Sequence, residues 1–218
     1  MLARRRAFLY VLDGLADWQT SLLVAELNGG GLVGRTEHRR RVTTVGASTD
    51  CVTTLGGLTL LPEDDAAAVT MRTCAVLILP GADTWLRPRH RPVLERAARL
   101  VAAGVPVAAI GSAVVGLASV GALDGRSHTA NSFDQLAEIP AYLGADRYRS
   151  LPVVRDRNLV TAMSAAPVHF AREVLALLGA MAPETLEQWF RLFRTEDAGQ
   201  VGAVLGTRAG RTGRQVGV

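Results

Sequence analysis

The most constraining feature of this sequence is the regular alternation of short apolar runs with segments of helical periodicity. The runs at residues 6–12, 74–79 and 105–110 are rich in Val, Ile, Leu and Ala, and each is followed along the chain by a helical pattern. Parallel strands need a crossover connection between them, so strands that alternate with helices are typical of a parallel sheet. We therefore predict an α/β fold built on a mostly parallel sheet.

The remaining pattern predicts further elements. Helices are expected at residues 17–27, 90–103, 113–120, 167–178 and 183–193, and strands at 40–45 and 58–61. Residues 151–154 and 158–162 are expected to form a hairpin around 155–157. From residue 195 the chain is rich in Gly, Arg and Thr without a period. We predict a single domain over residues 1–194 and a flexible C-terminal tail over residues 195–218.

Composition excludes several classes of function. No apolar run reaches the roughly 18 residues that a membrane span needs, and the short run after the arginines at 4–6 lacks the features of a signal peptide. We therefore expect a cytoplasmic protein without a membrane partner. The net charge is +4, but the arginines are scattered and aromatic residues are few. A nucleic-acid partner is therefore not expected.

Two cysteines, Cys51 and Cys74, lack any CxxC spacing and lie near no histidine cluster. This pattern predicts neither a metal site nor a disulfide, and we expect both thiols to be small core residues. Walker and dinucleotide-binding fingerprints are also missing from the sequence, so no cofactor is expected.

A strand, a sharp turn and a helix of small residues follow one another at residues 105–120. The strand Val-Pro-Val-Ala-Ala-Ile leads into Gly111 and Ser112, and the helix begins near Ala113. Ligands of open parallel sheets bind at the C-terminal ends of the strands. The loops at 13–19, 80–85 and 111–113 follow three predicted strands, and they supply our candidate binding residues, which are Trp18, Gln19, Gly81, Ala82, Trp85, Gly111 and Ala113.

Five segments in order resemble the ThiJ/PfpI superfamily, which has the class I glutamine-amidotransferase-like fold. They are VLDGLADW at 11–18, LILPG at 77–81, VAAI at 107–110, GALDGRSHT at 121–129 and FAREVL at 170–175. The resemblance implies a flavodoxin-like three-layer sandwich, with a mostly parallel central sheet and helices on both faces. It also implies a homodimer.

The sequence departs from the family pattern at two linked positions. Where the family has a nucleophilic cysteine after the Ala-Ala-Ile strand, this chain has Gly111, and the acid expected after Asp-Trp is Gln19. A buried carboxyl without a thiolate to organise would have a desolvation cost and no compensating role. Glycine also tolerates the strained backbone that such an elbow requires. The family's histidine is kept as His128.

Three side chains are candidates for catalysis. His128 or Asp17 would move a proton, and Ser112 is a possible replacement nucleophile. Each has a structural alternative: His128 as a packed histidine, Asp17 as a helix cap, and Ser112 as the first residue of its helix. Asp83 has the same two interpretations as Asp17. Trp18 and Trp85 are expected either to line a pocket or to pack at a dimer contact.

Three functional hypotheses remain open. The first is a cofactor-independent enzyme of the lyase, hydratase, isomerase or cyclase type, acting on a small-molecule substrate. In this hypothesis the N–H groups of Ala82 and Ser112 stabilise a developing oxyanion. The second is a non-catalytic protein that binds a small ligand or a protein partner. The third is a hydrolase that uses Ser112.

Overall fold

A computed structural model describes residues 5–29 and 40–195 of the chain. Its main sheet has seven strands in the order β5-β2-β1-β6-β7-β9-β8. The bounds of these strands, in chain order, are β1 Arg6–Tyr10, β2 Val42–Gly46, β5 Asp64–Asp65, β6 Cys74–Leu79, β7 Val107–Ile110, β8 Val153–Asp156 and β9 Leu159–Ala162. All neighbouring strands pair in parallel except β8 and β9.

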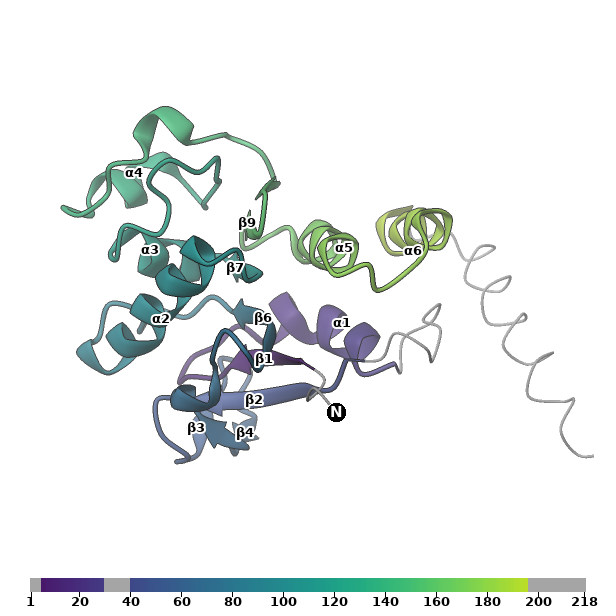
Figure 1. The fold of residues 1–218 in the computed structure, drawn as a ribbon, viewed down its shortest axis with the longest axis horizontal. Coiled ribbons are helices and arrows are strands. Elements are labelled where there is room, and N and C mark those ends of the chain that lie inside the picture. Colours follow the sequence, from purple (N-terminus) through teal and green to yellow (C-terminus); the bar gives the residue numbers. More distant parts are fainter. Residues whose placement is uncertain (1–4, 30–39, 196–218) are drawn as a thin grey trace, which may run out of the picture.

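Helices cover both faces of the sheet (Figure 1). Helices α1 (Asp17–Leu27) and α5 (Pro167–Leu177) pack together on one face, and α2 (Arg91–Ala102) and α3 (Ala113–Ala118) cover the other. Helix α6 (Pro183–Thr195) packs on α5, and its Trp189 indole donates to Glu26 Oε1 of α1 at 2.8 Å. The predicted α/β sandwich with a mostly parallel sheet is confirmed.

Strand β6 lies near the centre of the sheet, as its apolar composition predicts. Every residue of β6 is buried, as expected for a central strand covered by helices on both faces.

The chain runs from β1 to β2 on one side of β1 and later returns to β6 on its other side. At such a switch point the loops at the C-terminal ends of the strands diverge and leave room for a ligand. The loops after β1, β6 and β7 therefore lie where a site is expected.

Most predicted elements have the expected position. Helix α1 and strand β6 have the predicted bounds, whereas β1 ends two residues earlier than expected. The predicted hairpin turn is shifted, because Asp156 still pairs with Leu159 and Arg157 has a positive φ of 55°. Residues 196–218 of the predicted tail lie outside the described residues.

Several short elements were not predicted. They are helix α4 (Phe133–Ala137), strands β3 (Val52–Thr53) and β5, and three short 3-10 helices, Ala66–Ala68, Pro88–His90 and Ala145–Arg147. Strand β4 (Thr59–Leu60) lies within the strand predicted at residues 58–61, but its hairpin with β3 was not expected. Each is too short to leave a clear periodicity in the sequence.

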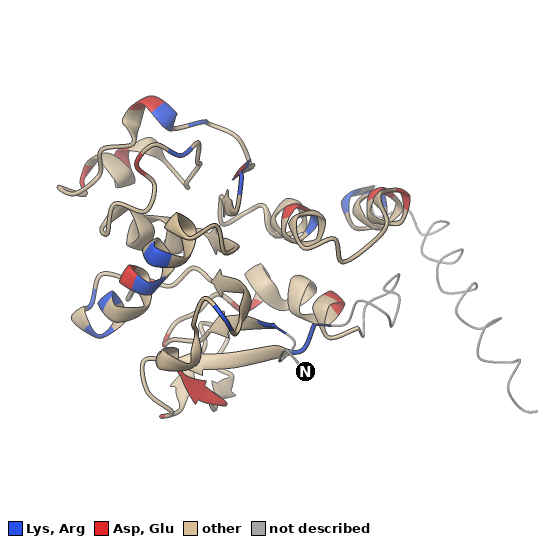
Figure 2. Ribbon diagram, in the orientation of Figure 1, with Lys and Arg blue, Asp and Glu red and all other residues tan. Residues whose placement is uncertain are grey.

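Charged residues are spread over many elements in the described part of the chain (Figure 2). Several arginines pair with nearby acids, as Arg91 does with Glu95 and Arg89 with Asp13. Within the described residues, no helix combines the length and the apolar character that crossing a membrane requires.

Candidate functional site

The centre of the candidate site is the turn between β7 and α3. Gly111 has a φ of +65°, in the left-handed region that favours glycine, and its N–H donates to the carbonyl of Ala162 at 2.9 Å. The parallel pairing of β7 with β9 thus extends to the elbow, and the chain then turns sharply into α3. The predicted strand–elbow–helix arrangement is present, with a bare backbone at its apex.

Gln19 lies against this elbow from the first turn of α1. Its side chain is buried, and its Oε1 accepts a hydrogen bond from the N–H of Gly81 at 2.7 Å. A Cβ on Gly81 would lie 2.7 Å from that same oxygen. A side chain at position 81 would therefore displace the Gln19 amide, which packs directly on the backbone there. The structure brings together Gln19, Gly81 and Gly111, as expected.

Ser112 holds the loop after β6 instead of capping its own helix. Its Oγ accepts from the N–H of Ala82 and donates to the carbonyl of Ala82, both at 2.9 Å. No side-chain cap is formed at the start of α3. The hydroxyl has no hydrogen bond to a histidine or a carboxylate among the described residues. The N–H of Ala82, which we expected to stabilise an oxyanion, is already occupied.

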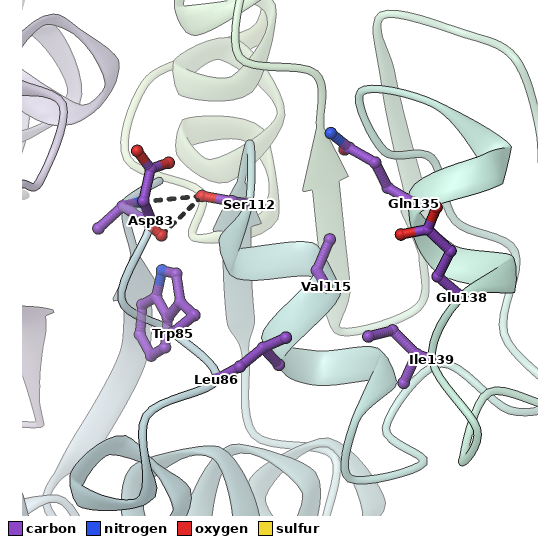
Figure 3. A pocket seen from close by; sticks show the side chains of 9 residues that line it. Asp83, Trp85, Leu86, Ser112, Val115, Gln135, Glu138 and Ile139 are labelled. Carbon is purple, nitrogen blue, oxygen red and sulfur yellow. Dashed lines mark hydrogen bonds between the residues drawn. The ribbon is translucent and has the colours of Figure 1, made fainter.

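A pocket of about 240 Å³ opens beside Ser112 (Figure 3). Its side near α4 carries Gln135, Glu138 and Ile139, which face Val115 and Leu86 across the opening. The remaining lining residues are Ala82, Asp83, Trp85 and Ser112. The pocket thus combines an apolar floor with two carboxylates, and no basic residue lines it. Sequence reasoning missed α4 and these three residues, of which Gln135 lies in the helix and Glu138 and Ile139 directly follow it; the sequence gives no strong signal for them.

His128 lies away from this pocket. It is fully buried, and its Nδ1 lies 2.8 Å from the carbonyl oxygen of Arg126 while its Nε2 lies 2.7 Å from Tyr142 Oη. A carbonyl can only accept, so Nδ1 carries the proton and Nε2 accepts from the tyrosine. Burial, as the largest influence, lowers the pKa of His128 and keeps it neutral. Both ring nitrogens are occupied, so the structure matches the alternative of a packed histidine.

Asp17 is also directed away from the elbow. Its Oδ2 accepts from the N–H of Gly56 at 2.7 Å, so the carboxylate supports the loop between β3 and β4. It does not cap α1, whose N-cap residue is Ala16. Hydrogen bonds from the Thr54 side chain and the Gly56 backbone lower the pKa of Asp17, so it stays ionised. The structure therefore does not bring Asp17 together with Ser112 or His128.

The two tryptophans have opposite environments. Trp85 is buried, donates its indole N–H to the carbonyl of Pro80 at 2.8 Å, and packs against Tyr10 and His90. One edge of it reaches the pocket. Trp18 is 54% exposed and lines neither described pocket. Ala113 is buried in the core below the elbow and lines neither pocket.

Neither cysteine lies at the elbow. Cys74 begins β6, at the opposite end of the sheet from Gly111, and burial raises the pKa of its thiol to about 12. Cys51 is exposed, so the expectation that both thiols are core residues is wrong for Cys51. It lines a separate pocket of about 100 Å³ together with Asp13, Arg89 and other residues. No group of His, Cys, Asp or Glu suited to a metal ion occurs among the described residues.

Ser164 is a site residue that sequence reasoning missed. It follows β9, and its Oγ lies 2.5 Å from the position that a Cβ on Gly111 would occupy. The space left by the missing side chain at Gly111 is therefore partly filled. The signal was available, because the loop after residues 158–162 also follows a predicted strand.

These features define a class, a doubly wound α/β domain with a candidate site at a strand–elbow–helix turn. The sequence pattern of the DJ-1/PfpI family matches residues 5–177. The chain belongs to the DJ-1/PfpI family, which confirms the predicted resemblance.

Individual relatives agree with this assignment. The protein named uncharacterized protease YoaZ, from Bacillus subtilis (strain 168), is 39% identical over 193 residues, which cover 88% of this chain and 92% of the relative. The crystal structure of a ThiJ/PfpI family protein from Bacillus anthracis has a TM-score of 0.87 and 36% identity, with 94% of this chain and 98% of that one covered. A DJ-1 superfamily protein from Agrobacterium tumefaciens has a TM-score of 0.78 and 29% identity, with coverages of 88% and 99%.

Proposed function

We propose that this chain binds a small organic molecule non-covalently, between the Gly111 elbow and the adjoining pocket, and does not convert it. The observation that carries this proposal is the commitment of each candidate catalytic group to another contact. Gly111 supplies no side chain, Ser112 holds Ala82, Asp17 holds Gly56, and His128 has both nitrogens occupied. The site keeps a family frame but lacks an available nucleophile among these residues.

The pocket itself supports a small ligand. Its volume of about 240 Å³ suits a small metabolite, somewhat below the roughly 300 Å³ at which drug-sized sites begin. Its apolar floor of Val115, Leu86 and Ile139 suits a hydrocarbon portion. Gly111 precedes Ser112 in the chain, and the elbow there offers polar backbone and the nearby Gln19 amide. A ligand with one apolar and one polar end fits this arrangement.

A second candidate function is acid–base catalysis on the same ligand, in the lyase, hydratase, isomerase or cyclase class. It is favoured by Glu138, whose carboxylate faces into the pocket (Figure 3). A carboxylate within reach of a substrate proton can act as a general base without any covalent intermediate. Under this candidate, Glu138 replaces His128 and Asp17 in the role that the sequence suggested for them.

The hydrolase hypothesis has the least support. Ser112 would need a base to remove its proton, and its hydroxyl proton is instead donated to the carbonyl of Ala82. The relative YoaZ is named an uncharacterized protease, and a serine-type protease activity of this chain would need Ser112 to be activated in this way.

The test begins with a thermal-shift screen of small organic compounds, followed by prolonged incubation of each hit with the chain. We expect hits to be recovered unchanged and the intact mass of the chain to stay constant. A product formed by wild type but lost in Glu138→Gln would replace this proposal with the acid–base candidate. The matched control is Glu95→Gln, which removes an exposed carboxylate on α2, outside the pocket.

A serine-directed fluorophosphonate probe separates the hydrolase hypothesis from the others. We expect no label on the wild-type chain. Labelling that disappears in Ser112→Ala would contradict the proposal.

The cytoplasmic location that the sequence suggested, and the homodimer that the family resemblance implied, are also part of this proposal.

A further inference from the structure

The pocket beside Ser112 offers a ligand several hydrogen-bond acceptors but few donors. The Ser112 hydroxyl and the Trp85 indole are already committed, because each donates to a backbone carbonyl. Asp83 and Glu138 can only accept when they are ionised. Among the side chains that line the pocket, Gln135 alone keeps an uncommitted N–H group. The lining therefore complements a ligand that brings its own donors.

The two carboxylates of this pocket have no partner within the chain as described. Neither Asp83 nor Glu138 forms an ion pair or a hydrogen bond with a residue in the ranges 5–29 and 40–195. The smaller pocket differs in this respect, because its Asp13 is paired with Arg89 at 2.9 Å. The negative charge of the larger pocket is thus not balanced by a basic side chain of the described residues.

The basic residues of the chain act elsewhere. The sequence has 24 of them and a net charge of +4, yet none of the described ones lines the larger pocket. Arg87 directly follows the lining residue Leu86, but its charge acts on Asp13 and His90, which line the smaller pocket. The larger pocket therefore has a local charge opposite in sign to that of the whole molecule, which attracts cations.

We propose that the ligand of this pocket is a small organic ammonium ion that carries an apolar chain. Its N–H groups donate to Glu138, whose carboxylate faces into the pocket from the end of α4 (Figure 3). Asp83 lies on the other side of the pocket and adds a second negative charge at longer range. This inference rests on the proposed function, because it assigns the charge of the same ligand.

The rest of the lining separates an organic cation from other ligands. The floor of Val115, Leu86 and Ile139 is apolar and suits a hydrocarbon chain, for which an inorganic cation has no use. No group of His, Cys, Asp or Glu suited to a metal ion occurs in the part of the chain that the structure describes. An organic anion would fill the same floor but would meet charges of its own sign.

The test compares three probes of equal chain length, which are n-pentylammonium, 1-pentanol and pentanoate. Each is added to the 15N-labelled full-length chain, and the side-chain amide signals of Gln135, assigned by their loss in Gln135→Ala, report binding. We expect a saturable shift with pentylammonium, a Kd about tenfold higher for pentanol, and no shift with pentanoate. Raising the ionic strength should weaken the binding of pentylammonium and leave that of pentanol unchanged.

Variants at the two carboxylates make the result specific. Glu138→Gln keeps the shape of the side chain but removes its charge, and it should raise the Kd for pentylammonium about threefold to tenfold. Asp83→Asn should raise this Kd about twofold. Both residues are exposed, so the variants should fold, and unchanged binding of pentanol checks that the pocket is intact.

The matched control is Glu184→Gln on α6. Glu184 is also an exposed carboxylate without a partner among the described residues, but it lines neither described pocket. The variant should bind pentylammonium as wild type does. The apolar part of the ligand is tested with ethylammonium, which should bind about tenfold more weakly than pentylammonium because it covers less of the floor.

The proposal is overturned if pentanol or pentanoate binds as tightly as pentylammonium, if no probe shifts the Gln135 signals, or if Glu138→Gln leaves the Kd for pentylammonium unchanged. These outcomes are distinct from failure of the proposed function, which the compound screen and the incubation decide. Conversion of a bound amine to a product would end the proposed function but leave the class of ligand standing.

Discussion

At the scale of single residues, the Gln19 side chain lies close to glycines in two neighbouring loops. The amide oxygen is 2.7 Å from where a Cβ on Gly81 would be, and the amide nitrogen is 3.1 Å from the corresponding position on Gly111. A carboxylate in this place would be buried with no thiolate to organise. The neutral amide is compatible with a neutral elbow, and one side chain thereby links α1 to the loops after β6 and β7.

This contact predicts that Gln19→Ala lowers the free energy of unfolding by about 2–4 kcal/mol. The buried N–H of Gly81 loses its acceptor, and a cavity forms where the amide was. Urea unfolding measures the change. The control is Gln135→Ala, whose side chain is exposed and which should change stability by less than about 0.5 kcal/mol. Equal decreases in the free energy of unfolding of the two variants would show that the Gln19 contact does not stabilise the fold.

At the scale of secondary-structure elements, the sequence predicts what depends on local pattern and misses what depends on distant partners. Helix α1 and strand β6 have long, clear patterns, and their bounds were correct. The elbow was also placed correctly, because it follows directly from the end of a strand. The hairpin of β3 and β4 was missed as a pair, because its strands have two residues each.

Side-chain direction is the part of the site that the sequence could not predict. Asp17 is turned by the N–H of Gly56, 39 residues away, and Ser112 by the backbone of Ala82, 30 residues away. His128 is turned by Tyr142, which lies in a segment without a clear period. No periodicity encodes such partners, so the same residues were compatible with catalytic and structural roles until the fold was known.

The Ser112 hydroxyl joins the elbow after β7 to the loop after β6, and this link predicts how the two segments depend on each other. Ser112→Ala removes both hydrogen bonds to Ala82 and should destabilise the chain by about 1–3 kcal/mol. Hydrogen exchange at the Ala82 amide should accelerate, because the loop after β6 loses its anchor. The measurement is amide exchange followed by NMR or mass spectrometry.

Ser119→Ala is the control for this experiment. The Ser119 hydroxyl donates to the carbonyl of Gly116, within its own helical segment, and its loss should leave exchange at Ala82 unchanged. Protection at Ala82 that survives in Ser112→Ala would contradict the structural role that we assign to Ser112.

At the scale of the whole molecule, the predicted boundary between domain and tail can be tested by truncation. Residues 196–218 have no apolar period, so we predict that their removal shifts the melting temperature by less than about 2 °C. Differential scanning calorimetry of the full-length and truncated chains checks this. A loss of 5 °C or more, on the order of 1–2 kcal/mol at this size, would show that the tail is part of the fold.

The expected homodimer has a candidate contact surface around Trp18. Trp18, Leu55 and Leu58 are each more than half exposed, and the hydrogen bond from Gly56 to Asp17 holds their two segments together. Exposed apolar groups of this kind mark contact surfaces. We predict that wild type sediments as a dimer and that Trp18→Ser shifts it toward monomer. Leu143→Ser, which changes another exposed side chain, should leave the assembly unchanged. A monomeric wild type would refute the prediction.

The stability of the whole molecule should depend on pH through His90. The ring is buried, with Nδ1 2.7 Å from Tyr10 Oη and Nε2 accepting from Arg89. Burial, and then the charges of Arg89 and Arg87, lower the pKa of His90 to about 4. In the unfolded chain the pKa returns to about 6.5. Between these values the unfolded state binds a proton that the folded state excludes, so folding stability falls as pH falls.

The contribution is fully present above about pH 6.5 and should decrease by up to about 3 kcal/mol on going down to pH 4. Urea unfolding at several pH values across this window measures it. His128 and His169 have lowered pKa values and act in the same direction, so the contribution of His90 is obtained by difference. In His90→Gln the amide can still accept from Arg89 and donate to Tyr10, but it does not titrate. The variant should therefore lose less stability than wild type on acidification. If the free energies of unfolding of the two proteins fall in parallel with pH, the His90 ring makes no contribution to the pH dependence, and the prediction is wrong.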